Sequence, residues 1–355
     1  MFSMATQARQ VYGGVDTHGR AHHAAAIDGT GQVLGDREFT ATPDGYRQLI
    51  TWLKQMGDVV KIGIEGTGSY GAGLARAATA ARIAIVEVDR PDRRARRRKG
   101  KSDPLDALAA ARAALSGEAA GVPKTRSGPV EAIRALRVAR RGAIKARTAA
   151  FNQLHGLIVS APASLRTALG DLRGQQLAGR CAAFRIDEDQ IGDPAVAAKA
   201  ALRAVARRII ALQEEIRAAD RRVAPLTAAV APKTTAVFGV GAEVAGQMLV
   251  TAGDNPERLR SEAAFAHLCA AAPIPASSGR TDRHRLNRGG DRAANTALYM
   301  VVVTRMRRHQ PTRDYVARRT AEGLSKTDII RCLKRFAARE IYYAIRADFQ
   351  TAHAT

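Results

Sequence analysis

A run of apolar residues spaced alternately three and four apart constrains the fold of this chain more than any other feature. The run comprises Leu202, Val205, Ile209, Leu212, Ile216, Ala219, Val223 and Leu226. This a/d seam predicts a long helix whose narrow apolar stripe packs against a partner helix. Residues 130–158 supply a second long, basic helix. The two helices, with a loop between them, predict an antiparallel coiled-coil arm, and two helices of a bundle are the alternative.

Strand and helix patterns alternate ahead of this arm. An opening three-stranded meander is predicted by apolar runs that end at turn residues. Helices and buried strands then follow in turn, which predicts an α/β domain with a mixed sheet covered by helices. The expected strands are 11–19, 21–32, 33–42, 59–66 and 82–89, and the expected helices are 43–57 and 70–81.

The charge of the chain favours a polyanionic partner. The 355 residues carry a formal net charge of +23, and nucleic acid is the commonest polyanion that such a surface binds. A generally Arg-rich composition is the alternative. Residues 90–101 are too charged to pack and predict a loop or mobile arm. The basic candidates for backbone contact are Arg93, Arg94, Arg96, Arg97, Arg98, Lys99, Lys101, Arg280, Arg283, Arg285, Arg288 and Arg292.

Several other patterns limit the function classes. The three cysteines are far apart, which predicts reduced thiols in a cytoplasmic protein rather than a zinc or disulfide framework. We expect no signal peptide and no membrane span. His18, His22 and His23 fit no standard zinc spacing.

The region after Pro232 predicts a helical domain. Gly239 and Gly241 form a turn between two apolar runs, where backbone N–H groups could hold a phosphate. An ordinary glycine-rich helix turn is the alternative. Further helices are expected from about Asp291 and over 326–345.

Four carboxylates stand at the ends of predicted elements. Asp16 ends the first strand, Glu65 ends a later strand, and Asp103 and Asp106 share one face of a helix. Taken singly, Asp103 reads as a helix cap, Asp106 as compensation of the helix dipole and Asp16 as a turn residue. Taken together they would repel one another unless a cation neutralised them, and oxygen ligands favour Mg²⁺ or Mn²⁺.

The motifs that carry these acids resemble a known family. "GVDTH", "IEGTGSYG" and "KSDPLDALAAA" resemble the Asp, Glu, Asp-x-x-Asp set of the DEDD insertion-sequence transposases, relatives of the Piv invertase that are also called bridge recombinases. "FGVGAEVAGQMLV", "FAHLCAAAPIPASSG" and "LNRGGDRAANTALY" match the family's pattern in order. The resemblance therefore covers almost the whole chain.

The resemblance implies a fold and a set of catalytic residues. It implies a RuvC-like, RNase H-like α/β catalytic domain over 10–125 and a coiled-coil helical arm over 126–230. It also implies a mostly helical C-terminal transposase domain over 231–350 with a helix-hairpin-helix-like turn. Asp16, Glu65, Asp103 and Asp106 would hold the metal. Ser278, with Ser277 as the neighbouring alternative, would attack DNA phosphate and form a covalent intermediate.

The resemblance also implies partners. The protein would insert a mobile element by recombination, with donor and target DNA chosen by an element-encoded structured RNA. It would act as a dimer or tetramer, in the bacterial cytoplasm and near the nucleoid. The alternatives are a RuvC-like structure-specific nuclease or invertase, a non-catalytic nucleic-acid-binding protein, and a sugar- or acetate-kinase-like enzyme.

Overall fold

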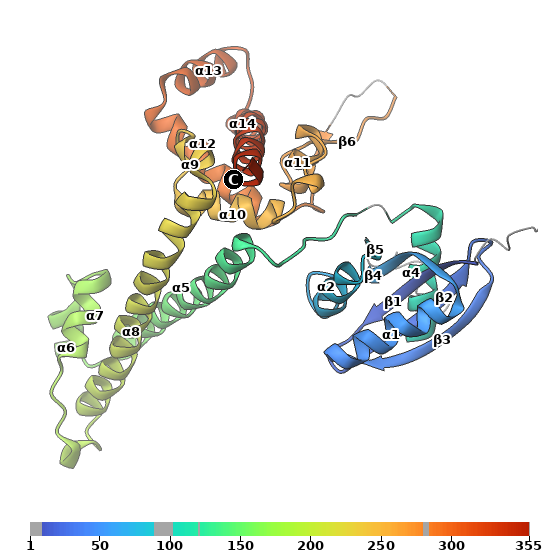
Figure 1. Cartoon of the computed structure of the whole chain (residues 1–355). Coiled ribbons are helices and arrows are strands. Elements are labelled where there is room, and N and C mark those ends of the chain that lie inside the picture. Colours follow the sequence, from blue (N-terminus) through green and yellow to red (C-terminus); the bar gives the residue numbers. More distant parts are fainter. Residues whose placement is uncertain (1–8, 89–101, 120, 280–283, 355) are drawn as a thin grey trace, which may run out of the picture. The chain divides into compact units, whose positions relative to one another are not determined.

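The computed structural model describes residues 9–88, 102–119, 121–279 and 284–354 (Figure 1). The predicted basic segment 90–101, with its candidate arginines and lysines, therefore lies outside the described residues. The chain divides into two compact units. One consists of Met1–Gly128 and Ala252–Phe265, and the other of Pro129–Thr251 and Ala266–Thr355.

The first unit is built on a five-stranded sheet in the order β3-β2-β1-β4-β5. The first three strands form the predicted antiparallel meander, and β4 and β5 run parallel to β1. Each strand falls within or next to its predicted range, so the expected mixed sheet is confirmed. The strands are β1 (Gln10–Thr17), β2 (Ala21–Asp28), β3 (Val33–Thr40), β4 (Asp58–Glu65) and β5 (Ala84–Val88).

Helices α1 (Pro43–Met56) and α2 (Ala72–Ala80) pack on one face of this sheet (Figure 1). Thr42 caps the start of helix α1, since its hydroxyl accepts a hydrogen bond from Gly45 N. Its apolar face buries Leu49 and Leu53 completely against Val11 and Val15 of β1. Burial of a leucine side chain typically stabilises a fold by about 2 kcal/mol, and these contacts therefore fix α1 on the sheet.

Helix α4 (Asp103–Ser116) packs against the opposite face of β1. Side chains alternate between the two faces of a strand. Gly14 points toward α4, whereas Val15 points toward the core under α1. The alanines on the inner face of α4 are buried, and this small-residue face lets the helix lie close to the sheet. A short η2 turn (Pro256–Arg258) also belongs to this unit.

The second unit contains two long antiparallel helices, α5 (Pro129–Ser160) and α8 (Pro194–Val230) (Figure 1). Arg140 Nε lies 2.5 Å from Asp220 Oδ1, and Arg147 bonds Gln213, so the residue numbers of the two helices run in opposite directions. Six of the eight predicted seam residues are buried. The other two, Leu212 and Leu226, are half-buried. The paired helices are thus confirmed, and a supercoil remains a prediction.

The expected loop between the two long helices contains further helices instead. These are α6 (Ala163–Leu169), α7 (Gly174–Ala182) and the short η1 turn (Glu188–Gln190). Leu165, Leu169, Leu177 and Cys181 are buried in one cluster with residues of α5 and α8. Tertiary packing, rather than a long periodic pattern, stabilises these short helices.

The remaining part of the chain is mostly helical. Asp291 caps the predicted helix α12 by accepting hydrogen bonds from Ala293 N and Ala294 N. All three cysteines are free, with Cys181 and Cys269 buried, as predicted. Within the described ranges, no helix is both long and apolar enough to cross a bilayer. The elements are α9 (Pro232–Ala236), α10 (Ala242–Ala252), α11 (Glu262–Leu268), β6 (Ile274–Pro275), β7 (His284–Arg285), α12 (Arg292–Arg308), α13 (Gln310–Ala321) and α14 (Lys326–Ala354).

Candidate functional site

Two of the predicted acids lie at the ends of neighbouring parallel strands. Val15 of β1 pairs with Ile64 of β4, so Asp16 and Glu65 follow at the same edge of the sheet. Thr17 reinforces this junction, because its hydroxyl donates a 2.8 Å hydrogen bond to the Glu65 carbonyl oxygen. Asp16 is only 5% exposed, and a carboxylate that is so far buried needs polar or charged partners.

The pleat places Asp16 and Glu65 on the face that α4 covers. Gly14 precedes Asp16 by two residues and Gly63 precedes Glu65 by two residues, so each pair shares a face. A β-carbon at Gly14 would lie 2.0 Å from Ala111 N, and one at Gly63 would lie 2.5 Å from the Ala110 carbonyl oxygen. Only glycine allows the helix backbone to approach these two strands so closely.

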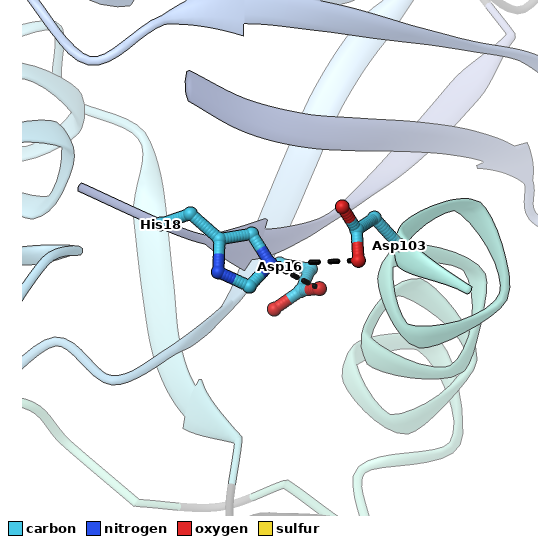
Figure 2. A group of neighbouring side chains, drawn as sticks. All are labelled: Asp16, His18 and Asp103. Atoms are coloured by element: carbon cyan, nitrogen blue, oxygen red, sulfur yellow. Dashed lines mark hydrogen bonds and ion pairs between the residues drawn. The ribbon is translucent and has the colours of Figure 1, made fainter. Parts of the chain in front are cut away.

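Asp103 reaches the strand end from the first turn of α4 (Figure 2). Asp103 is the first residue of the helix and Ser102 occupies the cap position, so the interpretation of Asp103 as a helix cap is wrong. Pro104 suits the first turn, where no intrahelical N–H partner is needed. The Asp103 side chain is half exposed and points toward β1 (Figure 2).

His18 connects Asp16 and Asp103. Its Nε2 atom lies 3.2 Å from Asp16 Oδ2 and 3.5 Å from Asp103 Oδ1 (Figure 2). One potential ligand atom from each of these three residues lies within 4.8 Å of the other two. The sequence pattern does not place His18 in the acidic group, because its only signal there is its position two residues after Asp16.

His22 lies on β2, next to the backbone of His18. Its side chain is fully buried and its ring stacks on Tyr46 with centroids 5.5 Å apart. The Nδ1 atom lies 3.4 Å from the backbone nitrogen of His18. Burial lowers the pKa of His22 below its ordinary value, which favours the neutral ring. His22 therefore supports the turn that carries His18.

Asp106 lies on the same helix as Asp103, and Glu65 lies on the strand next to β1, but neither belongs to the close group of three. Asp106 is one turn after Asp103, is 9% exposed and begins the buried face of α4. Glu65 is half-buried at the end of β4. The structure thus brings Asp16 and Asp103 together through His18, and it places the other two acids on the strand and the helix that adjoin them.

The donor set fits a divalent cation. Carboxylate oxygens suit Mg²⁺ and Mn²⁺, and an imidazole nitrogen is a better ligand for Mn²⁺ than for Mg²⁺. Asp16 is buried beside a second carboxylate, and like charges at this separation favour a bound cation. A site of this kind can bind phosphate oxygens and stabilise developing negative charge.

The predicted serines belong to the other unit. Ser277 and Ser278 are exposed and follow β6, which pairs with β7 in a short hairpin. Arg280 and Arg283 lie outside the described residues. Arg285, Arg288 and Arg292 are exposed, and their contact with a nucleic-acid backbone stays a prediction.

The predicted glycine turn connects α9 and α10. Gly239 has a φ of +81°, a conformation that favours glycine. Arg305 Nε donates a 2.9 Å hydrogen bond to the Phe238 carbonyl oxygen and Arg305 also pairs with Glu340 at 2.7 Å. The turn is therefore held by a buried arginine, and phosphate binding there stays a prediction.

Comparison with known proteins identifies two matching family models. Residues 13–161 match a DEDD transposase model that is described as a transposase. Residues 233–317 match a model described as the transposase IS116/IS110/IS902 family. No curated protein matches the chain. The first match contains all four predicted acids, and the second contains both candidate serines.

Proposed function

We propose that this chain, which belongs to the IS110 family of transposases, cuts DNA strands at a metal-dependent carboxylate site and binds the cut end covalently to a serine. The observation that carries this proposal is the approach of Asp16 and Asp103 to one another at the end of β1. The two family matches support a DNA transposase, and the chemistry of its site is the proposed part. A mixed sheet with α4 seated on it is consistent with the RNase H-like fold that the resemblance implied.

The residues that would hold Mg²⁺ or Mn²⁺ come from three elements of one unit. They are Asp16 of β1, Glu65 of β4, and Asp103 and Asp106 of α4. A bound divalent ion would supply charge stabilisation for the phosphate and would lower the pKa of a hydroxyl bound to it. The glycine contacts of α4 hold the four carboxylates on rigid elements, which favours a precise site.

Ser278 is the proposed nucleophile. Its hydroxyl oxygen forms a bond to a DNA phosphorus, and the bond from that phosphorus to one deoxyribose oxygen breaks. The leaving oxygen takes up the proton that the serine hydroxyl loses and becomes a free DNA hydroxyl. The hydroxyl of another strand then attacks the serine phosphodiester and releases the serine. The number of phosphodiester bonds is unchanged, so rejoining requires no nucleotide cofactor. Exposure of Ser278 is compatible with this role.

Nucleic acids are the proposed partners. The net charge of +23 suits a protein that holds donor DNA, target DNA and an element-encoded guide RNA together. Base pairing would then choose the sequence, and the protein would contact the backbone. Joining two duplexes favours a dimer or tetramer, with the α5 and α8 helices as an assembly arm. The three segments 10–125, 126–230 and 231–350 would divide catalysis, assembly and strand capture.

A recombination assay tests the proposal. Purified protein is mixed with element-end DNA, a target and the RNA from beside the gene, and joined products are sequenced. We expect products only with RNA and Mg²⁺ or Mn²⁺, and none with Asp16→Asn. Ser278→Ala should abolish the protein–DNA adduct, whereas Ser277→Ala should retain it. Cutting without joining would favour a structure-specific nuclease, and binding without cutting would favour a non-catalytic protein.

A further inference from the structure

We propose that a cavity at the base of the β6–β7 hairpin binds one unpaired nucleotide of a DNA strand. This strand is the one that reacts at the serine loop, the segment after β6 that contains Ser277 and Ser278. The inference rests on the proposed function, because that function brings a DNA strand to Ser278. The cavity has a volume of about 700 Å³. Ligand sites commonly occupy roughly 300–1,000 Å³, so the space suits a nucleotide.

The cavity lies within one unit, and the serine loop begins at its edge. Pro273 and the segment His284–Asn287 form one side, and α14 forms the other. Ser277 and Ser278 follow Pro275, the last residue of β6, by two and three residues. A strand held at Ser278 therefore has a neighbouring nucleotide within reach of the cavity.

The charge of the lining favours an anion. Among the described residues that line the cavity, four side chains are cationic at neutral pH and Asp328 is the one carboxylate. That carboxylate already accepts hydrogen bonds from Ser325 at 2.6 Å and from Arg331 at 2.7 Å. Burial and the neighbouring Arg331 lower the pKa of Lys334, so a phosphate there would relieve unfavourable cationic repulsion. The cationic residues are Arg285, Arg331, Lys334 and Arg335.

An aromatic ring in the lining favours a base. Phe336 is 48% exposed, which is unusual for such a large apolar side chain. Its ring is held edge-on by Tyr315, with centroids 5.6 Å apart and planes at 85°. Leu286 of the opposite wall is also half exposed. Bases stack on rings of this kind in proteins that bind single strands.

The walls are fixed by side-chain amides. Asn295 of α12 donates to the carbonyl oxygens of Ala270 at 2.8 Å and Cys269 at 3.3 Å, and it accepts from Lys334 Nζ at 3.0 Å. Asn287 donates to the His267 carbonyl oxygen at 2.9 Å. The two walls are thus tied to each other through α12, which reduces the ordering cost of binding.

The combination of cationic groups and a concave apolar wall favours an unpaired base over a duplex. The bases of a duplex are stacked inside it and reach a pocket only after they leave the stack. A duplex backbone would need the arginines but not Phe336. The contribution of Phe336 to binding therefore separates the two kinds of ligand.

The test measures binding of a short single-stranded deoxyoligonucleotide to the full-length protein by fluorescence anisotropy, in EDTA. We expect Phe336→Leu to weaken binding by about tenfold, the usual effect of losing one base–ring stack. Tyr343→Leu is the matched control, because Tyr343 is exposed on the same helix but outside the cavity, and it should bind as the unaltered protein does. Binding of the corresponding duplex should not depend on Phe336.

A second measurement uses the unaltered protein, in case Phe336→Leu does not fold. An oligonucleotide with 5-iodouracil at successive positions is irradiated, and we expect a cross-link within the α14 peptide that contains Phe336. The inference would be overturned if Phe336→Leu bound the single strand as tightly as the unaltered protein, or if the same substitution weakened duplex binding equally. Stronger Phe336-dependent binding of RNA than of DNA, or a cross-link outside that α14 peptide, would also overturn it. No recombination or cleavage enters these measurements, so failure of the proposed function would leave their result intact.

Discussion

Gly14 of β1 lies against Ala111 of α4 so closely that a β-carbon on Gly14 would be 2.0 Å from the Ala111 nitrogen. This contact determines where Asp103 lies, since α4 begins two turns before Ala111. The acidic group therefore depends on a glycine that carries no chemistry.

Gly14→Ala tests this dependence. The added methyl must displace the helix backbone, and we expect a loss of about 3 kcal/mol in the free energy of unfolding. Trp52, the single tryptophan of the chain, lies on α1 of the same unit, so its fluorescence in urea reports the loss. Gly29→Ala is the control, because its methyl would meet only the Gln10 side chain at 3.6 Å. Equal urea midpoints of unfolding for the two variants would contradict the close packing of α4 against Gly14.

His18 should contribute to metal binding. It contacts both Asp16 and Asp103, and loss of a ligand or of its neighbour typically weakens metal affinity by about 10- to 100-fold. We expect His18→Asn to weaken Mn²⁺ binding to that extent in an electron paramagnetic resonance titration. His23→Asn is the control, because His23 pairs with Asp36 at 2.6 Å, apart from the acidic group. Identical titrations of the two variants would remove His18 from the site.

His22 should make the first unit sensitive to acid. Burial lowers the pKa of His22 below 6.5 in the folded state, so the unfolded state binds more protons as the pH falls. The stabilisation is complete above about pH 6.5 and is lost as the pH falls through the folded pKa. Trp52 fluorescence reports unfolding at pH 7 and at pH 5. We expect His22→Phe to lose less stability over this range than the unaltered protein does. A parallel decline in both proteins would show that His22 has no such effect.

The a/d seam offers a matched pair on adjacent positions. Ile209 is fully buried in α8, whereas Ile210 is 38% exposed. We expect Ile209→Ala to lower the free energy of unfolding by about 2–5 kcal/mol, because it removes buried methyl groups and leaves a cavity. Ile210→Ala should cost no more than about 1 kcal/mol. Circular dichroism in urea measures both, and a reversed order would show that the seam is misassigned.

The strands of the first unit and the two long helices were predictable, because each has a strong period. Asp16 and Glu65 could be placed at strand ends for the same reason. The glycines of "VYGGVD" and "VVKIGIE" did carry a signal, since a glycine inside a strand indicates close backbone approach. That signal does not name the approaching element, which the structure shows to be α4.

Other features depend on tertiary contacts that a sequence pattern does not contain. Helices α6 and α7 are too short for a reliable period and are stabilised by contacts with α5 and α8. His18 joins the acidic group only because the end of β1 and the start of α4 meet. The cavity beside Phe336 likewise forms between a hairpin and a helix that are separated by α12 and α13.

The central claim is that the carboxylates at the end of β1 and the start of α4 cut DNA with the help of a divalent metal. The most direct measurement is the rate of DNA strand cleavage by the unaltered protein and by Asp16→Asn, with Mg²⁺ and with EDTA. We expect cleavage only with Mg²⁺, and a rate for Asp16→Asn that is lower by roughly a thousandfold or more at unchanged DNA binding. Asp36→Asn, which changes an exposed acid of β3, should cut at the normal rate. Cleavage in EDTA, or an undiminished rate in Asp16→Asn, would contradict the account.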